Sequence, residues 1–389
     1  MNICFVEDTP FCGGGQEWIL DTIDQFKNGL NYDIALIVPE SNLEMINKAK
    51  KLGTTVYTYS WENIPFNKIK YEEAWISGVK NANAVLCSVH PPRNNFHCTA
   101  FAAKCIKESG NKALLMPKTG TIVPSYKREY YIPDDEVKTE VITITGFTKK
   151  YLVEHYNIPE EKVNVLYQGT NTKKFTSTEF SKHESLKRYP LPRSHSPVLG
   201  VIGAFEERKG HIVLLKALKI LKEKFYPHVY TMFIGDGPLE EKLKQEVNEF
   251  NLKNNVSFYP FTHEANFIYD QMDILVLPSL YKEGLPNVLL EAMSMGVPCI
   301  ASRLAGTPEI IKDSENGFLF EPGDVDSLVS EIKSLWDDKE QYKYFSSSSR
   351  SMINHYFSRE NQVDKYSDFI IELLMKNQQY KEKFAKFSR

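Results

Sequence analysis

The sequence lacks long hydrophobic runs, a basic excess and a secretory leader. No stretch approaches the roughly 18 consecutive apolar residues that a membrane-spanning helix needs. The first residues show neither the basic nor the apolar region of a signal peptide. The 47 basic and 50 acidic residues among 389 give a net charge of −3. Neither half of the chain is basic, so we expect no nucleic-acid partner. Because no secretory signal is visible, we expect a cytoplasmic globular protein.

Metal and redox motifs are also missing. The six cysteines show no C-x-x-C spacing, which predicts buried, reduced thiols. The nine histidines include no H-E-x-x-H pattern, and no G-x-S-x-G motif occurs. Asp324-Val-Asp326 resembles a metal-binding D-x-D, but it precedes a predicted helix, where capping is favoured. We therefore expect no metal and no bound cofactor.

What the sequence does contain is a regular alternation of strands and helices. The length favours two or three domains. Short β-branched runs alternate with helical patterns, which is typical of α/β domains with doubly wound parallel sheets. The predicted strands are 3–6, 33–38, 55–59, 84–88, 113–116, 141–145, 163–167, 198–202, 231–234, 256–259, 274–277, 299–301 and 317–320.

A polar segment with three prolines divides the chain. Residues 176–197 end in Pro190, Pro192 and Pro197 and read as a linker between domains. The predicted domains are 1–175 and 198–359.

Three glycines follow the first predicted strand, in Cys12-Gly-Gly-Gly-Gln-Glu17. Gly14 and Gly15 would allow a ligand to approach the backbone, and the next helix would direct N–H groups at an anion. The alternative is a mobile turn between strand and helix. Three glycines exceed what a turn requires, which favours a ligand contact.

Two cations follow the predicted strand 198–202. Arg208 and Lys209 lie in Glu206-Glu-Arg-Lys-Gly210, at the carboxyl end of that strand. They could hold a diphosphate and stabilise the charge that develops on it as a leaving group. Taken alone, this segment favours a solvated charged loop over a ligand site.

The most informative segment is Glu283-Gly-Leu-Pro-Asn-Val-Leu-Leu-Glu291. Pro286 suits a first helical turn. Peptide N–H groups at Gly284, Leu285 and Asn287 would then face a phosphate. A carboxylate such as Glu291 can accept two hydrogen bonds from the diol of a ribose or a sugar. The alternative is a helix with two glutamates on its surface. The apolar neighbours of Glu291 argue against this alternative, because they predict that Glu291 is at least partly buried.

A histidine stands at the end of another predicted strand. His90, in Val85-Leu-Cys-Ser-Val-His90, could bind a sugar hydroxyl or transfer a proton. A purely structural role is an equal alternative for a lone histidine.

These residues together resemble a family 4 retaining glycosyltransferase with the GT-B fold. Glu283 to Glu291 resembles the family's E-x7-E motif. The segments on either side of this motif also resemble those of the family, and so do several segments in the first half of the chain. The supporting segments are 273–279, 296–301, 305–311, 316–319, 233–238, 13–15, 158–163 and 167–171.

The resemblance implies two Rossmann-like domains facing a cleft. It also implies a last helix that crosses back, which assigns residues 360–389 to the first domain. It implies that the second domain binds a nucleotide sugar and the first binds the acceptor. It implies that Lys209 contacts the donor diphosphate, that Glu291 holds the ribose, and that Glu283 lies near the transferred sugar. His90 would match the acceptor-side histidine, and no metal would be needed.

Three positions depart from the family pattern. Ala204 stands where an arginine is common, and Arg208 could replace its charge. Gln168-Gly-Thr-Asn171 and Ala305-Gly306 also differ from the usual residues.

The expected function is transfer of a sugar, favoured as UDP-linked, to a hydroxyl acceptor. The family suggests a saccharide or lipid-linked saccharide acceptor in bacterial surface polysaccharide or lipopolysaccharide assembly. A non-catalytic nucleotide-sugar-binding subunit and a nucleotide-sugar epimerase are the alternatives. Lys48, Lys50 and Lys51 could touch an anionic membrane, although a solvated face is favoured.

Overall fold

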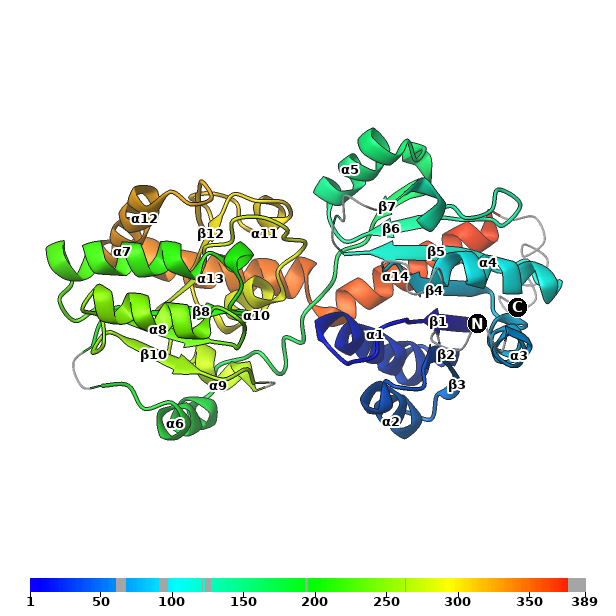
Figure 1. Ribbon diagram of the computed structural model, residues 1–389, viewed down its shortest axis with the longest axis horizontal. Coiled ribbons are helices and arrows are strands. Elements are labelled where there is room, and N and C mark those ends of the chain that lie inside the picture. The colour runs from blue at the N-terminus through cyan, green and yellow to red at the C-terminus, as the bar shows by residue number, and fades with distance from the viewer. Residues whose placement is uncertain are drawn as a thin grey trace. The chain divides into compact units, whose positions relative to one another are not determined.

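The computed structural model describes residues 1–60, 68–90, 97–120, 122, 127–192, 195–262 and 264–376. These residues form two compact units. Unit 1 comprises residues 1–168 and 360–389, and unit 2 comprises residues 169–359. Each unit is a parallel sheet covered by helices (Figure 1). All thirteen predicted strands are present, with small shifts at their ends.

Unit 1 is built on a seven-stranded parallel sheet in the order β3-β2-β1-β4-β5-β6-β7. Its elements, in chain order, are β1 (Asn2–Val6), α1 (Gly14–Asp24), β2 (Asp33–Pro39), α2 (Leu43–Lys51), β3 (Thr55–Tyr59), α3 (Lys68–Val79), β4 (Ala84–Ser88), α4 (Cys98–Glu108), β5 (Leu114–Thr119), β6 (Val141–Thr143), α5 (Gly146–Tyr156), β7 (Val163–Val165) and α14 (Arg359–Met375).

Strand alternation gives this sheet two separate cores. Ile3 and Phe5 of β1 pack with α1, α2 and α14 on one face. Cys4 and Val6 pack with α3 and α4 on the other. Successive side chains of a strand point to opposite faces, so a strand covered on both sides is apolar throughout. This arrangement confirms the predicted doubly wound sheet.

Unit 2 has a six-stranded parallel sheet in the order β10-β9-β8-β11-β12-β13. Its elements are α6 (Glu179–Arg188), β8 (Val198–Ile202), η4 (Glu207–Lys209), α7 (His211–Lys224), β9 (Tyr230–Ile234), α8 (Glu240–Glu249), β10 (Val256–Tyr259), α9 (Ala265–Tyr269), β11 (Ile274–Leu277), α10 (Asn287–Met295), β12 (Cys299–Ser302), α11 (Thr307–Ile310), β13 (Gly317–Phe320), α12 (Val325–Asp337) and α13 (Lys339–Tyr356).

The predicted boundary and linker differ from the structure. Unit 2 begins at Gly169, because the backbone of Thr170 bonds that of Phe357 and Arg359, each at 2.8 Å. Residues 176–197 are not a plain linker, since they contain α6. Ser185 on this helix accepts a hydrogen bond from Gln271 at 2.8 Å, which ties α6 to unit 2.

The last helix returns to unit 1, as the resemblance implies. Val363, Tyr366, Ile370, Leu373 and Leu374 of α14 are buried in the core shared with α1. The described helix ends at Met375, and residues 377–389 lie outside the described residues.

Two smaller predictions are confirmed. Asp324 caps α12 by accepting the N–H of Ser327 at 2.9 Å. All six cysteines are free thiols, and all except Cys12 are buried. None of the helices in the described ranges has the length and apolar character needed to span a bilayer.

Candidate functional site

The topology of unit 2 determines where a ligand can bind. The chain leaves β8 toward β9 and β10 on one side, and later returns to β11, β12 and β13 on the other. Open α/β sheets bind ligands beyond the carboxyl ends of the strands at such a switch point. The segments that follow β8 and β11 carry Lys209 and Glu283, so the structure places both predicted residues at this point.

Lys209 and Glu283 form a direct ion pair. The Lys209 ammonium lies 2.5 Å from Glu283 Oε1, and only 16% and 6% of the two side chains are exposed. Ser279 also donates to the same oxygen at 2.6 Å. A charge-assisted pair shielded from water is strong. The pair fixes the positions of one cation and one carboxylate, both of which can contact polar groups of a ligand.

A glycine holds the Lys209 loop against β11. Gly210 has φ +66°, and a Cβ there would lie 1.9 Å from the carbonyl oxygen of Pro278. Leu280 N–H also donates to the Arg208 carbonyl at 2.7 Å. Only glycine allows this backbone conformation and this close approach. The two strand-end segments are therefore locked to each other.

Arg208 does not join this pair. Its Nε donates to Glu206 Oε2 at 2.6 Å, and its side chain is partly exposed. The sequence left open whether Arg208 replaces the charge missing at Ala204. In the described residues of unit 2, Arg208 is committed to Glu206, and Lys209 is the cation paired with Glu283.

Helix α10 begins one residue later than expected. Pro286 is the N-cap with φ −69° and ψ 112°, and the helix starts at Asn287. The Gly284 carbonyl accepts the N–H of Gly306 at 3.2 Å, which fixes the preceding loop. The first N–H groups of a helix have no intrahelical acceptor, so the turn that begins at Asn287 can bind an anion.

Glu291 is held in an apolar setting on α10. Its carboxylate accepts a hydrogen bond from the Tyr269 hydroxyl at 2.8 Å. Burial raises the pKa of Glu291 to about 7, although the Tyr269 hydrogen bond and the charge of Lys174 oppose the rise. Near neutral pH this group can therefore act as acceptor or donor toward a hydroxyl.

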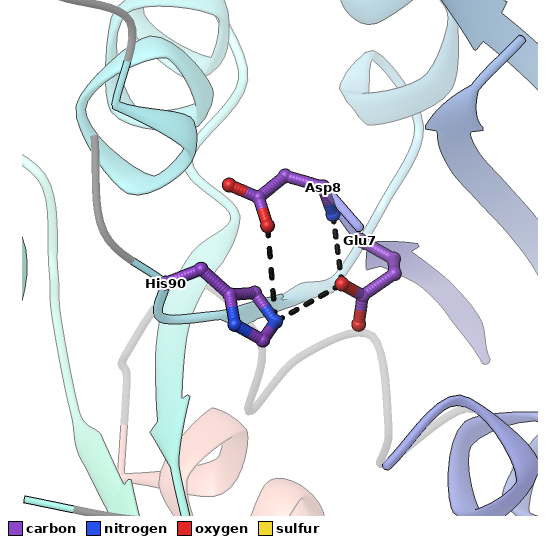
Figure 2. Close-up of side chains that lie close together, drawn as sticks. All are labelled: Glu7, Asp8 and His90. Atoms are coloured by element: carbon purple, nitrogen blue, oxygen red, sulfur yellow. Dashed lines mark hydrogen bonds and ion pairs between the residues drawn. The ribbon is translucent and has the colours of Figure 1, made fainter. Parts of the chain in front are cut away.

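Unit 1 has a second switch point, between β1 and β4. Two acidic residues, Glu7 and Asp8, follow β1 directly and are buried. His90 lies just beyond β4, with its Nε2 3.0 Å from Glu7 Oε1 and 3.7 Å from Asp8 Oδ1 (Figure 2). The predicted histidine is thus at a strand end, and its Nε2 faces two carboxylates.

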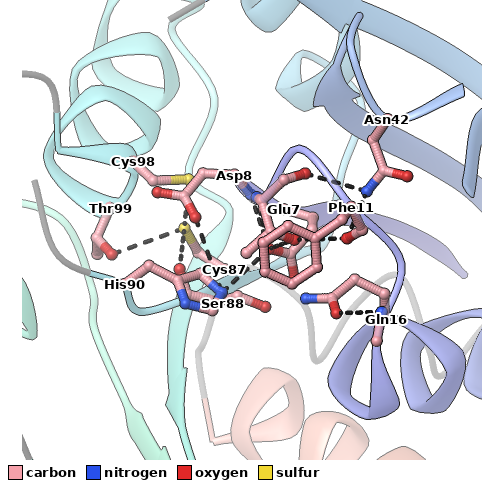
Figure 3. Close-up of polar contacts among 12 residues, drawn as sticks. Glu7, Asp8, Phe11, Gln16, Asn42, Cys87, Ser88, His90, Cys98 and Thr99 are labelled. Carbon is pink, nitrogen blue, oxygen red and sulfur yellow. Dashed lines mark hydrogen bonds and ion pairs between the residues drawn. The ribbon is translucent and has the colours of Figure 1, made fainter. Parts of the chain in front are cut away.

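Glu7 is the centre of a dense hydrogen-bond network (Figure 3). Its Oε1 accepts the N–H groups of Asp8 at 2.9 Å and Thr9 at 3.0 Å. Burial alone would raise its pKa, but the hydrogen bond and charge of His90, with Ser88 and the Asp8 amide, lower the pKa of Glu7 to about 2. Glu7 is therefore a carboxylate that fixes the orientation of His90.

The sequence reasoning missed Lys118, at the end of β5. The predicted strand 113–116 stops before Pro117, a residue type that is rare inside a sheet. The structure continues β5 to Thr119. Burial lowers the pKa of Lys118 to about 7, and the charge of Glu7 opposes the fall. Glu7 and Asp8 were also overlooked, although two acids directly after a buried strand are a recognisable signal.

The predicted glycine contacts lie at the start of α1. Gly14 and Gly15 are its first two residues, and Gly13 is the N-cap with φ −129°. A Cβ at Gly15 would meet nothing within 4 Å. Backbone strain therefore does not require these glycines, and the space beside Gly15 stays open at the helix N-terminus.

Among the described residues, two groups of side chains have a composition that could hold a metal: Glu7, Asp8 and His90, and Cys12, Glu17 and Glu44. In the second group both carboxylates bond the ammonium of Lys48, which supplies the positive charge. In the first group Glu7 Oε1 is already an acceptor for the backbone N–H groups of Asp8 and Thr9.

Comparison with known proteins connects this geometry to a family. Residues 183–352 match the family model described as glycosyl transferases group 1. UDP-Gal:alpha-D-GlcNAc-diphosphoundecaprenol alpha-1,3-galactosyltransferase of Escherichia coli is 28% identical over 239 residues, which cover 61% of each chain. The capsular polysaccharide biosynthesis glycosyltransferase CapM of Staphylococcus aureus is 25% identical over 57% of this chain and 58% of its own. The matches thus span less than two thirds of either relative.

A solved structure shares the fold over almost the whole chain. Anabaena Alr3699/HepE in complex with UDP superposes with a TM-score of 0.82 at 15% identity, covering 96% of this chain and 100% of that one. Two Rossmann-like units with a returning last helix constitute the GT-B fold that was predicted. Residues 183–352 thus resemble the glycosyl transferases group 1 family.

Proposed function

We propose that the chain is a retaining glycosyltransferase that moves a sugar from a UDP-linked donor to a hydroxyl acceptor. The observation that carries the proposal is the buried Lys209–Glu283 pair at the switch point of unit 2. Lys209 would neutralise the donor diphosphate, and the first turn of α10 would add N–H groups. Glu291 would hold the ribose, and Glu283 would face the transferred sugar.

The proposed reaction is a same-face displacement. The bond between the anomeric carbon and the diphosphate oxygen breaks, and the acceptor oxygen bonds to that carbon on the same face. The acceptor proton passes to the leaving diphosphate. Lys209 and the helix N–H groups stabilise the charge that grows on this group. These steps use only side chains and N–H groups of the chain, and we propose that no metal takes part.

The acceptor is proposed to be a saccharide or a lipid-linked saccharide in bacterial surface polysaccharide or lipopolysaccharide assembly. Support comes from the diphosphoundecaprenol in the name of the Escherichia coli relative and from the capsular relative. Unit 1 would bind this acceptor, with His90 near the accepting hydroxyl. Such an acceptor would place the enzyme at the cytoplasmic face of the membrane, which cosedimentation with anionic vesicles would test.

Binding and turnover test the proposal. A ligand that binds only the folded state raises the unfolding midpoint, so UDP, GDP and ADP sugars can be ranked by thermal shift. We expect UDP sugars to give the largest shift, with turnover unchanged by a chelator. The anomeric configuration of the product, read by NMR, then tests retention. An inverted product or a preference for another base would contradict these assignments.

A second candidate is a non-catalytic nucleotide-sugar-binding subunit. The pairing of Arg208 with Glu206 favours it, because the site then offers one cation where two were expected. Donor binding without transfer to any acceptor would support this candidate. Epimerised sugar after incubation with donor alone would support the epimerase instead.

A further inference from the structure

Lys118 is a cation in unit 1 whose ammonium contacts no anionic group of the described residues. Its Nζ lies 3.9 Å from the centroid of the Trp18 ring. Within the described ranges, Nζ has no hydrogen-bond acceptor and no carboxylate at ion-pair distance. An ammonium group carries three N–H donors, so those of Lys118 are available to a ligand beside the Trp18 ring.

The neighbours of Lys118 place it in the candidate acceptor site. Its side chain is on the same face of β5 as Leu114 and Met116, the face that α1 covers. Ser88 of β4 is its register partner, so Lys118 stands next to the strand that leads to His90. The carboxyl ends of β1, β4 and β5 thus bring Glu7, His90 and Lys118 to one edge of the sheet.

The local charge also favours an anion beside Lys118. Glu7, the charged group that acts on it, is already engaged by His90 and backbone N–H groups. Trp18 is the fifth residue of α1, so the ammonium packs against the N-terminal half of that helix and not against a carboxylate among the residues described.

We propose that Lys118 binds an oxyanion group, a phosphate or a carboxylate, carried by the acceptor in unit 1. This inference rests on the proposed function and deepens it, because it defines the class of acceptor. The ammonium contributes charge and hydrogen bonds, and the Trp18 ring holds the side chain in place through a cation–π contact.

The test uses the whole chain with UDP present at saturation, so that the donor site is filled. Sulfate and L-malate, titrated at constant ionic strength, stand in for a phosphate and a carboxylate. We expect at least one to raise the unfolding midpoint of the wild type. A larger response to sulfate would indicate a phosphate-bearing acceptor, and a larger response to malate a carboxylate-bearing one. No response to either would overturn the proposal.

Variants assign the response to Lys118. Lys118→Met keeps an unbranched side chain against Trp18 but removes the charge, and should weaken binding at least tenfold. Lys112→Met, at an exposed position just before β5, is the matched control and should bind as the wild type does. General salt effects raise every variant equally, so they cancel in this comparison. Equal binding by Lys118→Met and the wild type would overturn the assignment.

Lys118→Arg tests the assignment with a variant that is expected to keep sulfate binding and to change only its pH dependence. A lysine with a pKa near 7 is mostly charged at pH 6 and mostly neutral at pH 8. The wild type should therefore bind sulfate about tenfold more weakly at pH 8. Arginine remains charged, so Lys118→Arg should lose this dependence. Glu7, Asp8 and His90 also face this site, and they are unchanged in the variant. A wild-type pH dependence that persists in Lys118→Arg would exclude Lys118 as its source.

Failure of this proposal can be told from failure of the proposed function. UDP binding that depends on Lys209 tests the donor site by itself. If UDP fails to bind but sulfate binds through Lys118, the anion site stands and the glycosyltransferase proposal falls. If UDP binds through Lys209 but Lys118→Met binds sulfate and malate as the wild type does, the anion site falls and the proposed donor site stands.

Discussion

Lys209 carries the largest expected effect of any single side chain. It is the cation that pairs with Glu283 at the strand ends of unit 2, and the same Glu283 oxygen accepts a hydrogen bond from Ser279. Removing one preorganised group that stabilises a leaving charge costs about 3–4 kcal/mol at the transition state. Lys209→Ala should therefore lower kcat for sugar transfer by about 10²–10³ while the circular dichroism spectrum stays native.

Lys216→Ala is a suitable control for this loss, because Lys216 is an exposed lysine on α7 in the same unit. Its turnover should match the wild type. Near-normal turnover in Lys209→Ala would show that the cation is not used in the reaction.

Glu291 should make the stability of the protein depend on pH. Burial raises its pKa to about 7 in the folded state, above the ordinary value of a glutamate. The folded state therefore binds more protons than the unfolded state between about pH 4.5 and 7, so stability falls as pH rises through this window. A shift of this size corresponds to about 3 kcal/mol at most.

Glu291→Gln removes the titration but keeps an acceptor for the Tyr269 hydroxyl. In urea unfolding, the variant and the wild type should be similar at pH 5, and the variant should be more stable at pH 8. If the free energy of unfolding falls equally between pH 5 and pH 8 in both proteins, a group other than Glu291 causes the pH dependence.

At the scale of elements, one glycine should decide whether the loop that carries Lys209 forms. Gly210 precedes α7 with a positive φ and touches the backbone after β11. Gly210→Ala should cost at least about 2 kcal/mol of unfolding free energy and weaken UDP binding, because both strain and overlap must be relieved by moving the loop. Chemical denaturation and thermal shift with UDP would measure the two effects.

Gly29→Ala is the matched control. Gly29 is not at a positive φ, and a Cβ there would meet nothing within 4 Å. This variant should be neutral or slightly stabilising. A similar decrease in unfolding free energy and UDP binding in both variants would mean that the close backbone approach at Gly210 has no special importance.

The elements also show where prediction from the sequence succeeds. The strands were predictable because buried parallel strands are short apolar runs between turn residues, and such runs are visible without an alignment. Helix α6 was not, because its polar sequence resembles a linker and its position depends on contacts such as that of Ser185 with Gln271. The end of β5 was missed for a different reason. Proline is rare inside a sheet, yet β5 continues through Pro117 to Thr119 and so includes Lys118.

For the whole molecule, the return of the chain through α14 couples the two ends of the sequence. Tyr366 is fully buried, its ring centroid is 5.1 Å from that of Trp18, and its hydroxyl donates to the Leu166 carbonyl at 3.1 Å. Tyr366→Ala should destabilise unit 1 by about 3–5 kcal/mol, because it leaves a cavity in a packed core.

Hydrogen exchange can locate this effect. Protection of β1 and β2 in unit 1 should fall, and protection of β8 and β9 in unit 2 should change much less. Lys365→Ala, an exposed neighbour on the same helix, should leave both units unchanged. Equal loss of protection in both units would contradict an independent core in each.

The sequence by itself determined the strand and helix order, the two wound sheets and the segments that carry Lys209, Glu283, Glu291 and His90. These features depend on local patterns, namely apolar runs, glycines and motif spacing. Only the tertiary structure decided which side chains meet. It joined Lys209 to Glu283, turned Arg208 to Glu206, oriented His90 on Glu7 and left Lys118 over Trp18. Such pairings depend on which strand ends lie next to each other, and strand order is set by packing between segments far apart in the chain.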